Sequence, residues 1–127
     1  MHTRNLAYID LSQRKIEKRP IPPEWRRRYL GGRGLGAYLL YNHTQKGLDP
    51  LSPDNPLILS AGLLTGHFTN ATSRLHVTGK SPDTGIYGDS NAGGAIAAEL
   101  KYAGFQHVLI TGKAEKPPRE GGRGPGR

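Results

Sequence analysis

Apolar and polar positions fall into short blocks along the chain, and each block predicts one short element. Residues 5–11 place Ala7, Ile9 and Leu11 on one face, which is the period of a β-strand. A more polar block at 15–19 predicts a second strand, so the chain is expected to open with a hairpin. Prolines directly after this block indicate that the hairpin ends there.

The remaining blocks also predict short elements. Proline at the start and glycine after the end are typical of helices, which we expect at 23–30, 34–42 and 95–102. Short apolar or alternating runs predict strands at 57–59, 74–78 and 107–111. The long polar, glycine-rich segment 81–94 is expected to be a loop.

Composition limits the class of protein. A chain of 127 residues with 18 Gly and 10 Pro is expected to form one turn-rich domain, at residues 1–117. Residues 118–127, rich in Gly, Pro and Arg, offer nothing apolar to pack and are expected to be a disordered tail. The absence of cysteine excludes a disulfide, a thiolate zinc site, an iron–sulfur cluster held by this chain and a cysteine nucleophile. Without a membrane span or a signal peptide, a soluble cytoplasmic protein is expected.

The net charge of +8 is concentrated at the two ends of the chain. Residues 1–33 carry +6 and residues 113–127 carry +3, whereas the middle carries −1. A small basic nucleic-acid-binding protein is therefore one alternative, and a non-catalytic assembly subunit is another. Nucleic acid ranks low, because only two Phe and one Trp are present for base stacking. Any anion-binding site in the nearly neutral middle, residues 34–112, must therefore be built from one or two side chains and nearby backbone.

The strongest local signal is the segment 88–94, Gly-Asp-Ser-Asn-Ala-Gly-Gly, before the helix expected at 95–102. Free amides at a helix start and two glycines would allow a phosphate to approach. The alternative, which local sequence alone favours, is that Ser90 or Asn91 caps the helix and the glycines shape the loop. The sequence does not decide between these interpretations.

Arg74 is the second candidate, because it shares a strand face with His76 and Thr78 and its guanidinium can bind a phosphate through two hydrogen bonds. A solvated arginine is the commoner alternative. The run 31–36, Gly-Gly-Arg-Gly-Leu-Gly, fails as a dinucleotide motif because it follows a predicted helix, which leaves Arg33 as a weaker candidate anion contact. No histidine pair, carboxylate pair or nucleophile motif completes an active site.

Several ordered blocks together resemble the N-terminal domain of the tungsten-containing aldehyde:ferredoxin oxidoreductase family. In order along residues 5–117, the similar blocks are Tyr-Leu-Gly-Gly-Arg-Gly-Leu-Gly at 29–36, Asp-Pro-Leu-Ser-Pro-Asp-Asn at 49–55, Ala-Gly-Leu-Leu-Thr-Gly at 61–66, Lys-Ser-Pro-Asp-Thr-Gly at 80–85, Asp-Ser-Asn-Ala-Gly-Gly at 89–94, Glu-Leu-Lys-Tyr-Ala-Gly at 99–104 and Gly-Lys-Ala-Glu-Lys-Pro at 112–117. Such a series is far more specific than one glycine motif.

The resemblance implies an α+β fold of two β-sheets with short helices, which cradles a tungsten bis-pterin cofactor (tungstopterin). It implies that Arg74, Asn91 and Gly93 contact the pterin, and that Asn91 helps to hold a Mg²⁺ ion between the pterin phosphates. The family oxidises aldehydes to carboxylic acids and passes electrons through a [4Fe–4S] cluster to ferredoxin. The resemblance therefore gives Arg74 and the segment around Asn91 the same role, which is to contact a phosphorylated pterin.

The chain departs from the family pattern after residue 117. The cluster cysteines, further pterin contacts and acid–base residues of the family lie beyond this domain. We therefore expect the chain alone not to catalyse and to need the remainder of the oxidoreductase, as downstream domains or a separate chain. A truncated or frameshifted product and a separately encoded piece are both compatible with this sequence.

Overall fold

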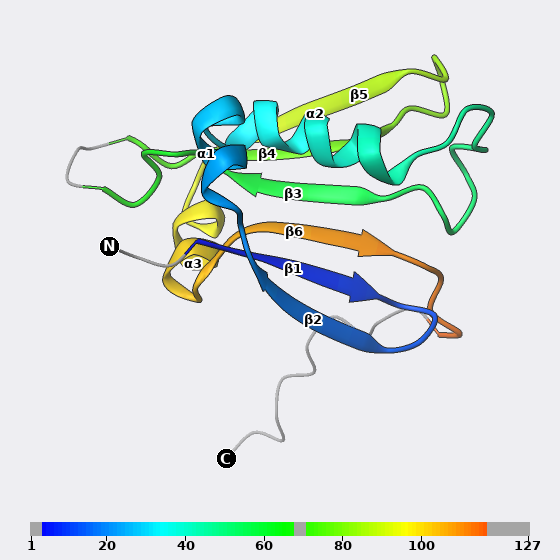
Figure 1. Ribbon diagram of the computed structural model, residues 1–127, viewed down its shortest axis with the longest axis horizontal. Helices are drawn as coiled ribbons and strands as arrows, with labels where there is room; N and C mark the ends of the chain where they lie inside the picture. The colour runs from blue at the N-terminus through cyan, green and yellow to red at the C-terminus, as the bar shows by residue number, and fades with distance from the viewer. Residues whose placement is uncertain (1–3, 68–70, 117–127) are drawn as a thin grey trace.

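The computed structural model describes residues 4–67 and 71–116. The described chain forms six strands and three helices. Figure 1 shows their arrangement. Their bounds are β1 Asn5–Asp10, β2 Lys15–Pro20, α1 Pro23–Tyr29, α2 Gly32–His43, β3 Leu57–Ala61, β4 Leu75–Lys80, β5 Tyr87–Ala92, α3 Ile96–Tyr102 and β6 Phe105–Thr111. This confirms the α+β class. The tail expected at 118–127 lies outside the described residues.

All six strands form one sheet in the order β2-β1-β6-β3-β4-β5. The expectation of two sheets within this chain is therefore wrong. The reason is β6, which pairs in parallel with β1 and antiparallel with β3 and so joins the opening hairpin to the β3–β4–β5 strands. Every other neighbouring pair is antiparallel.

The helices cover both faces of this sheet. Ile58 of β3 packs in a core with Leu35 and Leu39 of α2. Its neighbours Leu59 and Ala61 belong to a second core with α3. Because successive strand residues point to opposite faces, α2 and α3 lie on opposite sides of the sheet. Among the described residues, no helix is long and apolar enough to cross a membrane.

The structure corrects the expected loop at 81–94. Residues Tyr87–Ala92 form β5, which pairs with β4 from Lys80↔Tyr87 to Leu75↔Ala92. The strand was missed because it lies at the sheet edge and is largely exposed, so its side chains show no apolar period. The expected cap is also wrong, because Ser90 and Asn91 lie within β5. Helix α3 begins after Ala95 with no side-chain cap.

Candidate functional site

Arg74 and Gly93 occupy adjacent ends of two paired strands. The register of β4 and β5 ends at Leu75↔Ala92, so Arg74 is the residue before β4 and Gly93 the residue after β5. The Arg74 backbone is fixed, because its amide donates to Thr65 Oγ1 at 3.3 Å and its carbonyl accepts from the Gly62 amide at 3.0 Å. The Arg74 side chain is exposed. The fold thus brings together two of the predicted site residues.

Asn91, the third predicted residue, pairs with His76 across the same two strands. Its Oδ1 atom lies 3.0 Å from Nδ1 of His76. Because Oδ1 is an acceptor, this contact requires the ring proton on Nδ1. His76 is only 4% exposed, whereas Asn91 is exposed. The contact therefore joins an exposed residue to the protein interior.

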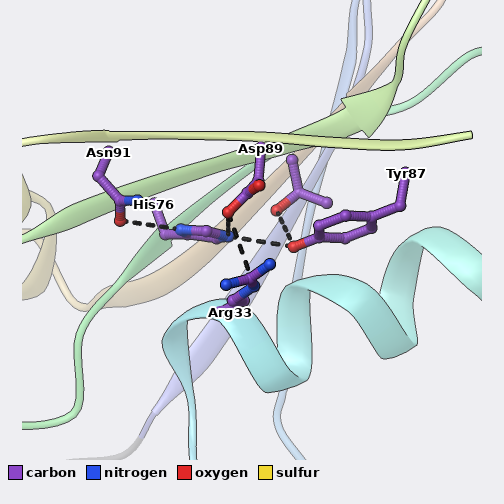
Figure 2. A network of polar contacts seen from close by, with 6 residues as sticks. Arg33, His76, Tyr87, Asp89 and Asn91 are labelled. Atoms are coloured by element: carbon purple, nitrogen blue, oxygen red, sulfur yellow. Dashed lines mark hydrogen bonds and ion pairs between the residues drawn. The ribbon is translucent and has the colours of Figure 1, made fainter. Parts of the chain in front are cut away.

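The opposite side of the His76 ring faces Tyr87 and Asp89 of β5 (Figure 2). Nε2 lies 3.1 Å from the Tyr87 hydroxyl and 3.5 Å from Asp89 Oδ2. The Tyr87 hydroxyl also lies 3.5 Å from Thr78 Oγ1. With the proton on Nδ1, Nε2 accepts from the Tyr87 hydroxyl. Both ring nitrogens therefore have polar partners.

Arg33 reaches this network from α2. Its Nε lies 3.6 Å from Asp89 Oδ2, and its guanidinium carbon lies 5.8 Å from the centre of the Tyr87 ring. Because 69% of its side chain stays exposed, this ion pair contributes little to stability. Arg33, the weaker candidate anion contact, is paired with an acid of the site.

Gly93 borders open space. A Cβ atom added there, or at Gly94, would meet no atom of the described chain within 4 Å. At Gly93, protein packing therefore does not require glycine, whereas at Gly94 the backbone φ of +90° favours glycine by itself. A backbone without a side chain next to an exposed arginine fits a bulky anionic ligand, such as a phosphorylated pterin, that approaches the main chain.

The same residues fit a metal ion less well. Among the described residues, no group of three or more His, Cys, Asp or Glu side chains could hold one. The Oδ1 atom of Asn91 already accepts from His76. A Mg²⁺ contact through that atom would have to replace this hydrogen bond, and other ligands would have to come from outside the described residues.

Sequence reasoning missed His76, Tyr87 and Asp89 as members of the site. His76 was noted only as sharing a strand face with Arg74. The alternation of residues 74–78 places His76 on the polar face with Arg74 and Thr78, so nothing in the sequence indicated that this face would be buried. Asp89 lies in the segment 88–94 that the sequence singled out, but its contact with His76, like that of Tyr87, follows only from the strand at 87–92.

The chain is similar to known proteins over most of its length. Residues 6–118 match the family described as aldehyde ferredoxin oxidoreductase, N-terminal domain. The tungsten-containing aldehyde ferredoxin oxidoreductases of Pyrococcus furiosus and Thermococcus kodakarensis are 43% and 38% identical over 109 residues. That region is 86% of this chain and 18% of each relative, so the chain spans less than a fifth of their length.

A solved structure is also similar. In the active site complex BamBC of benzoyl coenzyme A reductase with 1,5-dienoyl-CoA, one chain superposes with a TM-score of 0.86 at 36% identity. The match covers 88% of this chain and 17% of that one. Sequence and structure agree: this chain belongs to the aldehyde ferredoxin oxidoreductase N-terminal domain family.

Proposed function

We propose that this domain contributes pterin contacts to a tungsten bis-pterin cofactor within a larger aldehyde-oxidising enzyme. The observation that carries the proposal is the placement of Arg74 beside Gly93 at the ends of β4 and β5, where the space around Gly93 is open. Family membership and the tungsten-containing relatives support the same assignment.

Each residue has a distinct task in this proposal. The guanidinium of Arg74 binds a phosphate or a polar edge of the pterin through paired N–H donors. Gly93 lets the ligand approach the main chain. Asn91 donates from its Nδ2 group while Oδ1 keeps the His76 contact. Its assignment as a Mg²⁺ contact belongs to the same proposal and requires exchange of that hydrogen bond for the cation.

The chemistry of aldehyde oxidation would come from the tungsten centre when it is bound. This chain holds no cysteine, so the ligands of a [4Fe–4S] cluster must come from other parts of the enzyme. The proposal therefore includes the rest of the oxidoreductase as partner, ferredoxin as the electron acceptor of the complete enzyme, and a cytoplasmic location. In this proposal, the described residues bind and orient the pterin cofactor.

Reconstitution tests the proposal. The chain is co-expressed with the Pyrococcus furiosus relative lacking its own N-terminal domain, and the purified assembly is analysed for tungsten and for pterin by the fluorescence of its oxidised form. Arg74→Gln should lower both contents severalfold. The matched control is Arg28→Gln, which removes the same charge from an exposed position on α1.

Two results would contradict the proposal. One is an assembly that forms with the unmodified chain and retains no pterin. The other is an equal pterin content in the Arg74→Gln and Arg28→Gln assemblies. Either would remove these residues from the cofactor site, while the family membership of the chain would stand.

A further inference from the structure

A second site lies in a pocket of about 920 Å³ between α1, α3, the start of β6, residues 65–67 and Arg4, which precedes β1. Both helices lie at the same end of the sheet (Figure 1). Leu30 and Phe105 contribute apolar surface. The described lining contains four cationic side chains and no carboxylate. The cationic residues are Arg4, Arg26, Arg27 and Lys101.

Gln106 forms part of the wall, and an irregularity in the sheet places it there. The β1–β6 register passes from Asn5↔Phe105 to Leu6↔His107, so Gln106 is an extra residue with no partner on β1. Such bulges redirect a side chain and are common beside functional sites. Gln106 is 2% exposed, yet neither Oε1 nor Nε2 has a hydrogen-bond partner in the described chain.

Gly31 makes room for this amide. A Cβ atom at position 31 would lie 2.6 Å from Nε2 of Gln106. An unpaired buried amide costs stability unless a ligand or water satisfies it. Because Gln106 borders the pocket, a ligand bound there can supply the missing partners.

Among the residues that the structure describes, no acidic side chain forms an ion pair with the cations of the pocket. Partial burial, and next the charge of Arg26, lower the pKa of Arg4. Partial burial, and next the charge of Arg4, lower the pKa of Lys101. The Lys101 ammonium donates to the Leu63 carbonyl at 2.9 Å, which is a neutral partner. A bound anion would relieve this repulsion.

We propose that this pocket binds a small ligand that carries a phosphate or carboxylate group on an apolar body. The cationic groups would take the anion, Gln106 would pair with a polar atom of the ligand, and Leu30 and Phe105 would cover the apolar part. The volume and the mixture of apolar lining with few convergent polar groups are typical of small-molecule sites.

This proposal is independent of the cofactor proposal. Arg74, Asn91 and Gly93 do not line the pocket. Thr65 does, and its hydroxyl also accepts from the Arg74 amide, so the two sites are neighbours. Ligand binding here is measured on this chain alone and needs neither pterin nor tungsten.

The test is a nuclear magnetic resonance titration of the 127-residue chain with phenyl phosphate, inorganic phosphate and phenol. The side-chain amide signals of Gln106 report on the pocket. Phenyl phosphate should shift them and bind about tenfold more tightly than either phosphate or phenol, because only it supplies both the charge and the apolar body. Weak binding of phosphate alone, with no gain from the ring, would overturn the apolar part of the proposal.

Variants assign the binding to this pocket. Arg26→Gln should weaken phenyl phosphate about tenfold, whereas Arg28→Gln, on the same helix but outside the pocket, should change it less than about twofold. Gln106→Leu should weaken binding and raise the midpoint of thermal unfolding, because it removes an unpaired buried amide. A structural role for Gln106 would instead lower the midpoint.

Three outcomes would overturn the proposal. They are equal losses of affinity in Arg26→Gln and Arg28→Gln, no shift of the Gln106 amide signals, and tighter binding of an acidic, leucine-rich peptide than of phenyl phosphate. The last result would make the pocket a protein-docking surface. If Gln106→Leu fails to fold, the comparison of Arg26→Gln with Arg28→Gln still tests whether the ligand binds in this pocket.

Discussion

The Nδ1 atom of His76 and the Oδ1 atom of Asn91 lie 3.0 Å apart, from a buried ring on β4 to an exposed side chain on the edge strand β5. Asn91 is therefore held from the inside, and its position depends on the orientation of the His76 ring. Tyr87 and Asp89 hold that ring from the other side. A candidate cofactor contact at the surface is thus oriented by a network that reaches into the sheet.

Replacing Asn91 tests this dependence. Asn91→Leu should lower the free energy of unfolding by about 1–3 kcal/mol, because it leaves a buried ring N–H without an acceptor. Urea denaturation of the isolated chain measures the change. The control is Ser90→Ala, an exposed neighbour on β5 that should change stability by less than about 0.5 kcal/mol. Equal effects of the two variants would show that the His76 contact does not stabilise the fold.

Gly36 marks the close approach of α2 to the sheet. A Cβ atom there would lie 3.1 Å from Thr78 Oγ1 and 3.2 Å from Ser60 Oγ, and both of those residues are fully buried. Gly36→Ala should therefore destabilise by about 1–2 kcal/mol despite the better helix propensity of alanine. Ser60→Ala has its own cost, because Ser60 Oγ contacts the buried His107 Nδ1 at 2.8 Å. Adding Gly36→Ala to Ser60→Ala should therefore cost less than adding it to the unmodified chain. A stabilised single variant would show that helix and sheet can separate freely.

His107 predicts a specific pH dependence. It is fully buried, its Nδ1 contacts Ser60 Oγ at 2.8 Å, and burial, followed by the charge of Arg4, lowers its pKa to about 3. In the unfolded chain the pKa is about 6.5. Between these values the unfolded state binds the proton and the folded state does not, so stability falls as pH decreases from about 6.5 towards 3.

The measurement is the free energy of unfolding by urea at several pH values, with His107→Gln as comparison. The unmodified chain should lose up to about 1.4 kcal/mol per pH unit more than the variant in that window. Above pH 7 the difference between the two should be constant. If the two plots of unfolding free energy against pH run parallel across the whole window, folding does not lower the pKa of His107.

Gly93 separates cofactor binding from folding. Because no described atom lies within 4 Å of an added Cβ atom, Gly93→Val should change the free energy of unfolding of the isolated chain by less than about 1 kcal/mol. In the reconstituted assembly the same variant should lower tungsten and pterin content, since the side chain occupies the space proposed for the ligand. Normal pterin content would exclude a close approach at Gly93.

Most helices and buried strands could be predicted from the sequence, because their apolar residues recur with a definite period. Leu35 and Leu39 of α2, and Ile58 of β3, are examples. The strand β5 could not, because an exposed edge strand gains its stability from backbone pairing with β4 and leaves no apolar pattern. The expectation of two sheets came from the family resemblance, and the local sequence could not correct it, because it does not reveal pairing between residues as distant as Asn5 and Phe105.

The candidate site was predicted in part. Arg74, Asn91 and Gly93 were named through the family resemblance, and the β4–β5 register brings them to one end of the sheet. Their roles toward the cofactor stay predictions. The pocket around Gln106 was not predicted, because it depends on a bulge in β6 that follows from the register and not from residue type.

The parallel pairing of β1 with β6 determines when this domain can fold. Ser12, just after β1, accepts a hydrogen bond from the amide of Lys113, which follows it by 101 residues. The opening hairpin therefore waits for almost the entire domain to leave the ribosome before its inner edge is paired. Until then β1 exposes unpaired backbone, so aggregation during synthesis is the expected cost of this topology.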